Sequence, residues 1–196
     1  DIHWRVIPIH DAPLDRLPES LPAGQIGELV VSGPVVTTRY VTRQEVNRWA
    51  KIDVEGTIWH RMGDVGYLDQ SDRFWFCGRM AHRVQTEQGT LYTVPCEAVF
   101  NTHKDVYRSA LIGLGPAGRQ RPVLVVEPFS HALPSNREGR QAFIAALAAL
   151  AAKFPHTTSI RDFLFHADLP VDIRHNAKIF REKLVPWAER KLRCQA

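Results

Sequence analysis

Residues 58–79 read IWHRMGDVGYLDQSDRFWFCGR, and this stretch indicates how the first part of the chain folds. Short apolar or alternating runs are separated by glycines and by the polar turn Gln70-Ser71-Asp72, a pattern typical of antiparallel strands joined by tight turns. We therefore expect a small antiparallel, barrel-like sheet in residues 1–80. The expected strands are His3–His10, Gly27–Gly33, Ile58–Gly63, Val65–Asp69 and Arg73–Gly78.

One helix interrupts this strand-rich part. The run Thr42-Arg43-Gln44-Glu45 has the spacing of a capping box, in which the hydroxyl and the carboxylate each accept a hydrogen bond from a free backbone amide. We interpret this segment as structural only.

After Met80–Ala81, where we place a domain boundary, strands and helices mix, so the expected fold class is α+β with domains at 1–80 and 81–196. Apolar residues at helical spacing predict a long helix that begins near Ser135-Asn136. The other expected elements are a short helix after Pro95, strands at Ser109–Leu114, Pro122–Val126 and Asp162–His166, and a basic terminal helix after Lys178 that is bent or stopped at Pro186.

The bulk composition, 44% hydrophobic and 23% charged over 196 residues, is that of an ordinary globular protein. The net charge is +4, and basic residues gather near the C-terminal end. We interpret them as a solvated helix face, close to a nucleotide phosphate, rather than as a nucleic-acid surface. The three cysteines and nine histidines show no metal-ligand spacing, so no metal site or disulfide framework is expected.

The chain shows neither a secretory signal pattern nor an apolar run of about 20 residues, so we expect a cytoplasmic protein without a membrane span. It begins with Asp1 rather than Met and runs directly into a strand-like segment. We therefore expect it to be a piece of a longer protein.

The run Gly113-Leu114-Gly115-Pro116-Ala117-Gly118 matches the G-x-G-x-x-G fingerprint of dinucleotide binding. That fingerprint requires a helix to follow it, whereas Arg121–Val126 is a β-branched strand. A glycine-rich hairpin turn is the better interpretation.

Asp64 and Arg79 are candidates for contact with a ribose and a phosphate. A carboxylate between Gly63 and Gly66 can accept both hydroxyls of a ribose, because the glycines allow the backbone to approach a ligand. The guanidinium of Arg79 supplies a fixed fork of donors for oxygen ligands. Each residue also has an ordinary interpretation, Asp64 as a turn residue and Arg79 as a surface ion pair.

Lys178 follows a polar loop and directly precedes the terminal helix. An ammonium group held there could bridge a carboxylate and an α-phosphate and stabilise the charge of a phosphoryl-transfer transition state. A solvated lysine is the alternative.

These segments together resemble the adenylate-forming superfamily of acyl-CoA synthetases, adenylation domains and luciferases, over essentially the whole chain. The resemblance rests on the order and spacing of short motifs. They are Gly27–Pro34 followed by Tyr40 (GELxxxGP...Y), Trp59–Asp64 (W-x-R-T-G-D), Gly78-Arg79 (G-R), Pro95-Cys96-Glu97 (P-x-E) and Asn176-Ala177-Lys178 (G-K).

The resemblance implies a role for each candidate residue. Asp64 becomes the ribose-binding carboxylate, with Arg79 and Tyr67 as further nucleotide contacts. Ala81 takes the position of the interdomain hinge, and Lys178 that of the catalytic lysine. Residues 1–80 then correspond to the C-terminal β-subdomain of a large AMP-binding domain, and residues 81–196 to a small mobile lid.

Met62, Ala81 and Ala177 each depart from the family pattern, and the most telling departure concerns the thiol substrate. The basic V-K-I-R-G stretch of the family is replaced here by Val84-Gln85-Thr86-Glu87-Gln88-Gly89. Because Glu87 would repel a CoA phosphate, thioester formation is disfavoured. Residues 170–184 are instead similar to the β-lactone synthetases of bacterial olefin biosynthesis.

That similarity implies that ATP adenylates a β-hydroxy fatty acid and that the 3-hydroxyl of this acid then closes a β-lactone. It also implies Mg²⁺ as a cofactor, with protein ligands expected upstream of residue 1. Other enzymes of the same pathway are possible partners. The alternatives are a long-chain acyl-CoA synthetase or acyl-AMP ligase and, outside the enzymes, a nucleotide-binding or lid fragment that is inactive alone.

Overall fold

The computed structural model of the chain describes residues 1–172 and 174–194. It divides into two compact units, residues 1–81 and 82–196, and the whole is α+β.

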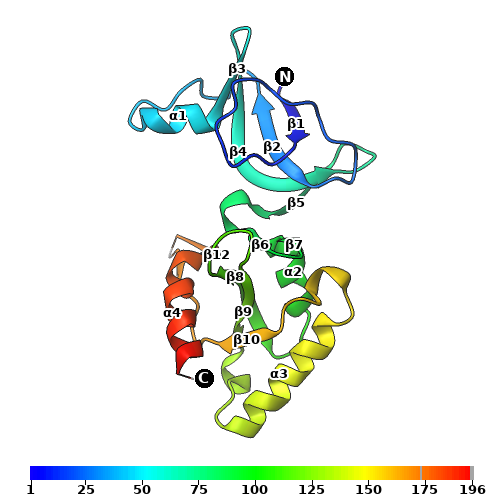
Figure 1. The fold of residues 1–196 in the computed structure, drawn as a ribbon, viewed down its shortest axis with the longest axis vertical. Helices are drawn as coiled ribbons and strands as arrows, with labels where there is room; N and C mark the ends of the chain where they lie inside the picture. The colour runs from blue at the N-terminus through cyan, green and yellow to red at the C-terminus, as the bar shows by residue number, and fades with distance from the viewer. Residues whose placement is uncertain (173, 195–196) are drawn as a thin grey trace. The chain divides into compact units, whose positions relative to one another are not determined.

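The first unit is built on one antiparallel sheet in the order β1-β2-β4-β3, with β5 also paired to β4. Figure 1 shows β4 running alongside both β2 and β3. The segments expected as separate strands at 58–63 and 65–69 form the single strand β4, whose ladders shift near Val65. The strands are β1 (His3–Ile7), β2 (Gly27–Ser32), β3 (Lys51–Val54), β4 (Thr57–Leu68) and β5 (Phe74–Arg79).

The barrel-like closure expected for this unit is wrong, because the sheet in the described residues remains open. The first half of β4 pairs with β3 and its second half pairs with β5, while β2 occupies the opposite edge. The sheet therefore branches along β4 instead of returning to β1.

The helix α1 (Gln44–Ala50) is present, but the capping box that predicted it is not. The N-cap residue is Arg43, and no side chain caps the helix. Because the helix begins later than the motif requires, the Thr42 hydroxyl lies before the cap. The Asn47 side chain instead accepts from the Tyr40 amide at 2.6 Å and donates to its carbonyl at 3.0 Å, which ties the preceding loop to the helix.

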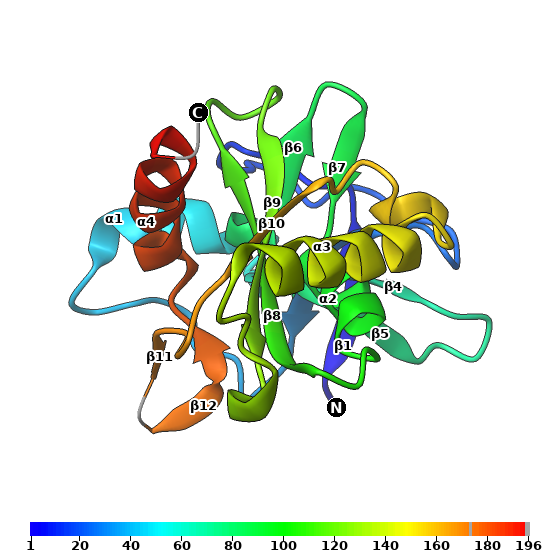
Figure 2. The same cartoon turned by 90° about the horizontal axis from the view of Figure 1, so that it is seen from below.

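The second unit places a three-stranded sheet between helices (Figures 1 and 2). The central strand β9 pairs antiparallel with β8 and parallel with β10. The helices α2 and α3 contribute Phe100 and Leu147 to one core, and α4 contributes Leu184 and Ala188 to a second. The elements are α2 (Thr93–Phe100), β8 (Val106–Leu114), β9 (Arg121–Pro128), α3 (Arg137–Ala151), β10 (Asp162–Phe165) and α4 (Arg181–Arg193).

Two small hairpins complete this unit, β6 (Val84–Thr86) with β7 (Gly89–Leu91) and β11 (Val171–Asp172) with β12 (His175–Ile179). The glycine-rich run after β8 is a hairpin turn, as predicted, with Gly115 and Gly118 at positive φ. Of the bend or stop expected at Pro186, the stop does not occur, because Pro186 lies inside α4. Its ring removes one helical hydrogen bond, while the buried Leu184 and Ala188 hold the helix on the sheet.

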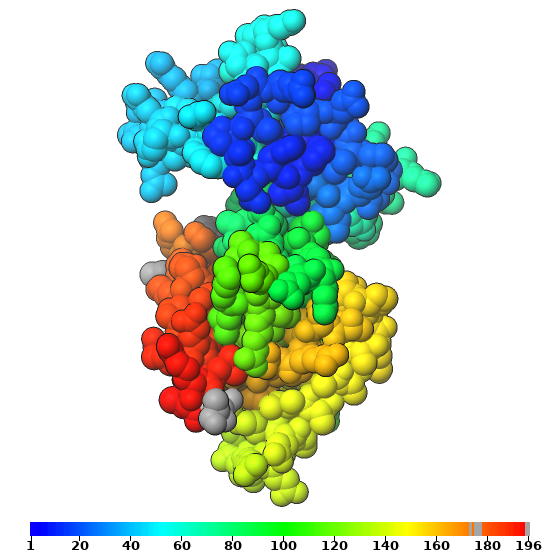
Figure 3. Space-filling view, in the orientation of Figure 1, coloured from blue at the N-terminus to red at the C-terminus, as the bar shows by residue number. Residues whose placement is uncertain are grey.

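The outer surfaces of α3 and α4 form part of the exterior of this unit (Figure 3). Short 3-10 turns lie at Met80–His82, Ser130–Ala132 and Pro155–Thr157. Within the described residues no helix combines the length and the apolar character needed to cross a membrane.

Candidate functional site

Asp64 and Arg79 are direct cross-strand partners in the β4–β5 ladder. An Arg79 terminal nitrogen lies 3.0 Å from the Asp64 carboxylate and donates to the Met62 carbonyl at 3.1 Å. The Asp64 side chain is 19% exposed and that of Arg79 is 56% exposed, so both can be reached from solvent. The hairpin thus brings together two candidates that are well separated in the sequence.

The electrostatics of this pair are those of a half-buried carboxylate. Burial raises the pKa of Asp64, and the nearby Arg79 guanidinium partly opposes that rise. A carboxylate that accepts and a guanidinium that donates, side by side at a strand end, can together bind hydroxyl and phosphate oxygens.

Two positions near Asp64 favour glycine, each for a different structural reason. Gly63 adopts φ +66°, a conformation that favours glycine. At Gly66 a Cβ atom would lie 2.2 Å from the Trp75 carbonyl oxygen and 2.6 Å from the Phe74 ring. Gly66 therefore allows β5 to approach β4 closely, while Gly63 sets the backbone that precedes Asp64.

Tyr67 lies on the same hairpin but has a different neighbour. Its ring stacks on Trp75 with 6.3 Å between centroids and 8° between planes. In the described part of the chain no hydrogen bond or ion pair joins Tyr67 to Asp64 or Arg79. Ala81 is exposed in the 3-10 turn Met80–His82 and is the last residue of the first unit.

Lys178 belongs to the second unit and lies on β12, so the polar loop expected before it is a hairpin. The Phe180 amide donates to the Pro170 carbonyl at 2.8 Å and closes the hairpin base. The Lys178 ammonium is exposed and lies 5.7 Å from the centroid of the Phe180 ring. The side chains of Asn176 and Ala177, which complete the motif, lie outside the described residues.

The carboxylate of Asp172 organises the other strand of this hairpin. It accepts from the Arg174 amide and from the Arg174 guanidinium at 3.0 to 3.1 Å. These hydrogen bonds lower the pKa of Asp172, and the charge of Lys178 adds to the effect. Asp172 is therefore negatively charged at neutral pH, and the positive charge of Lys178 lies close enough to stabilise it.

The sequence did not single out Arg181, the first residue of α4. Its guanidinium donates to both oxygens of Glu97 on α2, at 2.7 and 2.9 Å, and both side chains are largely buried. No local pattern signals this pair, because its two members lie 84 residues apart in the sequence.

No cluster of three or more histidine, cysteine, aspartate or glutamate side chains that could hold a metal ion occurs in residues 1–172 and 174–194. The three cysteines of the chain are free thiols. The first unit offers a carboxylate that can accept from hydroxyls and a guanidinium that can donate to anionic oxygens, and the second unit offers an exposed ammonium.

Comparison with known proteins gives strong sequence matches. The chain is 47% identical to an olefin β-lactone synthetase from Xanthomonas campestris, over 94% of this chain and 34% of that protein. It is 45% identical to an olefin β-lactone synthetase from Stenotrophomonas maltophilia, over 98% of this chain and 35% of that protein. The chain thus spans about a third of the length of these relatives. No protein-family model matches it.

The fold also matches solved structures. The ATP-bound structure of MatB from Rhodopseudomonas palustris superposes with a TM-score of 0.75 at 20% sequence identity, over 94% of this chain and 33% of that one. At this identity the match concerns the fold alone.

Proposed function

We propose that this chain is a C-terminal part of an adenylate-forming enzyme similar to the olefin β-lactone synthetases, and that the protein containing it converts a β-hydroxy fatty acid to a β-lactone at the expense of ATP. The observation that carries this proposal is the 45–47% identity to two olefin β-lactone synthetases, which extends over nearly the entire chain. The motifs that resemble the superfamily lie within the same alignment.

The proposed reaction has two steps. The substrate carboxylate attacks the α-phosphorus of ATP, which forms acyl-AMP and releases pyrophosphate. The substrate's own 3-hydroxyl oxygen then attacks the acyl carbon, the bond to AMP breaks, and the hydroxyl proton is lost. Because nucleophile and electrophile belong to one molecule, the second step has a high effective molarity and needs no second substrate.

The nucleotide-binding role falls to the β4–β5 hairpin. Asp64 accepts the ribose hydroxyls, and Arg79, held 3.0 Å from Asp64, donates to the ribose or the phosphate. Tyr67 is a further nucleotide contact in this proposal. Burial raises the pKa of Asp64, which means that the carboxylate is only partly hydrated. A partly desolvated carboxylate of this kind is typical of a ligand-binding site.

Lys178 is the catalytic residue of the first step. Its exposed ammonium, on a hairpin that projects from the second unit, bridges the substrate carboxylate and the α-phosphate as negative charge develops. We assign the second unit the role of a mobile lid and Ala81 the role of its hinge, with residues 1–80 as the end of the AMP-binding domain.

Mg²⁺ accompanies ATP in this proposal, with ligands upstream of residue 1. The described residues offer no cluster that would hold the ion, so they do not fit a magnesium site of their own. Mg²⁺ bound to the phosphates would neutralise their charge, whereas the residues of this chain bind the ribose and orient the carboxylate.

The β6–β7 hairpin supports a reaction without CoA. Glu87 lies at the exposed tip between Thr86 and Gly89, where the family pattern has a basic residue. A carboxylate there repels a CoA phosphate, so the second step uses the internal hydroxyl.

The proposal is tested by pyrophosphate exchange into ATP, measured on the full-length protein with a long-chain 3-hydroxy acid and with the matching acid that lacks the hydroxyl. Both acids should support exchange, because both carry the carboxylate, but only the hydroxy acid should release free AMP at steady state. If neither acid supports exchange, the adenylation step is contradicted. Equal AMP release from both would contradict the role of the hydroxyl.

A further inference from the structure

The hairpin that carries Lys178 joins the rest of its unit next to two buried carboxylates. One is Glu127 at the end of β9, and the other is Glu97 in α2. We propose that Glu97 and Glu127 are positioning residues that fix the two ends of the β11–β12 hairpin and so place Lys178 for the reaction. This inference rests on the proposed catalytic role of Lys178.

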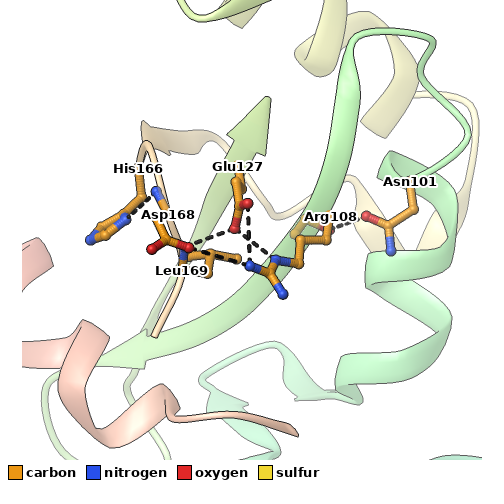
Figure 4. Close-up of polar contacts among 7 residues, drawn as sticks. Asn101, Arg108, Glu127, His166, Asp168 and Leu169 are labelled. Carbon is orange, nitrogen blue, oxygen red and sulfur yellow. Dashed lines mark hydrogen bonds and ion pairs between the residues drawn. The ribbon is translucent and has the colours of Figure 1, made fainter. Parts of the chain in front are cut away.

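The first anchor holds the chain where it enters the hairpin. Glu127 accepts from the Leu169 amide at 2.7 Å, and the same carboxylate accepts from Arg108 at 2.7 and 3.2 Å. Figure 4 shows Glu127 between the Arg108 guanidinium and the Leu169 amide, with Asp168 beside them. The Glu127 side chain is 8% exposed and Leu169 is buried, so this hydrogen bond is shielded from water.

The second anchor holds the chain where it leaves the hairpin. Arg181 follows Lys178 by three residues and is bound by both oxygens of Glu97. Glu97 also accepts from the Leu111 amide of β8 at 2.7 Å. One carboxylate therefore links three elements, namely α2, the edge of the sheet and the start of α4.

Between the anchors the hairpin is closed by its own hydrogen bonds. The Phe180 amide donates to Pro170, and Val171 pairs with Ile179. Lys178 thus lies next to a closed base whose two ends are tied to the sheet and to α2. A rigid base limits the positions that the ammonium can reach, which is what transition-state stabilisation by a single charge requires.

Stability alone does not account for these carboxylates. Burial raises the pKa of Glu97 against the effect of Arg181, because the charged form loses its hydration. Apolar residues of similar size often replace buried ion pairs without loss of stability. Apolar residues cannot accept hydrogen bonds, whereas Glu127 accepts from the Leu169 amide and Glu97 accepts from the Arg181 guanidinium. These two contacts lie at the two ends of one hairpin.

The anchoring is tested by hydrogen exchange on the full-length protein with Glu97→Gln and Glu127→Gln. Amides of residues 169–180 should exchange at least about 10-fold faster than in the wild type, whereas amides of α3 should change much less. Ile160→Val serves as the control, because it truncates the core on the opposite face of the sheet and leaves both anchors intact. Unchanged exchange in the hairpin of both Gln variants, or equal acceleration in the control, would overturn the proposal.

The kinetic consequence is measured separately as acyl-AMP formation. Glu97→Gln should lower kcat about 10- to 100-fold with little change in the KM for ATP, and Glu97→Asp should recover part of the loss. If Glu97→Gln does not fold, Arg181→Lys tests the same contact more mildly. Full kcat in these folded variants would overturn the positioning role. If the wild type forms no acyl-AMP, the proposed function fails, while the exchange result still decides whether the hairpin is anchored.

Discussion

Arg61, in the middle of the Trp59–Asp64 motif, is a buried side chain that bonds to several partners in the first unit. It donates to the Glu28 carboxylate at 2.7 and 3.0 Å. It also donates to the carbonyls of His10 and Ala12 at 2.6 and 2.8 Å. Arg61 is 5% exposed and Glu28 is 1% exposed. This part of the motif therefore holds the segment after β1 on the sheet, while Asp64 remains available for a ligand.

Arg61→Met should lower the free energy of unfolding of the first unit by about 3–5 kcal/mol, because it leaves the buried Glu28 carboxylate without its partner. Urea unfolding followed by tryptophan fluorescence measures the change. Arg73→Met is the matched control, since Arg73 pairs with Asp69 in an exposed turn, where ion pairs contribute little. Equal effects of the two substitutions would contradict the structural role of Arg61.

At the scale of elements, the turn between β4 and β5 is organised by Asp69. Its carboxylate accepts from the amides of Ser71 and Arg73 at 2.8 and 3.1 Å and from the Trp75 indole at 2.9 Å. The hydrogen bond from Trp75 is the largest of the contributions that hold the pKa of Asp69 well below its usual range.

Because the pKa of Asp69 is lower in the folded state than in the unfolded state, its ionised carboxylate stabilises the hairpin fully at any pH above the unfolded-state pKa of about 3.9. This stabilisation is lost only as the pH falls through the lower folded-state pKa. The indole N–H resonance of Trp75 should therefore stay constant as the pH falls through 4 and move only below it. The midpoint of that movement in an NMR titration is the measurement. A midpoint at or above about 4 would show that the hydrogen-bonded turn does not form.

Much of the element pattern was predictable, because it follows from local alternation and turn residues. The β4–β5 hairpin, the β8–β9 hairpin and the long helix α3 all occur where the sequence placed them. The open sheet was not predictable, since sharing one edge of β4 between β3 and β5 depends on register between distant strands.

The candidate site was predictable only in part. The order of short motifs drew attention to Asp64, Arg79 and Lys178, and the hairpin register places the first two 3.0 Å apart. The roles of Glu97 and Arg181 could not be read from local pattern, because they meet across 84 residues of sequence. A buried ion pair of this kind depends on tertiary packing, which leaves no periodic signal.

At the scale of the molecule, we propose different functions for Asp64 in the first unit and Lys178 in the second, and substitutions should separate them. Lys178→Ala should reduce acyl-AMP formation by at least about 100-fold with little loss of ATP affinity, because the lysine acts on transition-state charge. Asp64→Ala should instead weaken ATP binding, which isothermal titration calorimetry measures directly. Lys183→Ala is a control, since Lys183 also lies near the Phe180 ring but on α4. Normal acyl-AMP formation by Lys178→Ala would contradict its catalytic assignment.

The most direct test of the proposed function follows the oxygen of the substrate hydroxyl. Full-length protein is supplied with ATP, Mg²⁺ and a long-chain 3-hydroxy acid labelled with ¹⁸O at the hydroxyl, with and without CoA, and the product is identified by mass spectrometry and NMR. We predict a CoA-independent β-lactone that is one water lighter than the acid and keeps the label in its ring. A CoA thioester, or a lactone that has lost the label, would contradict the proposed function.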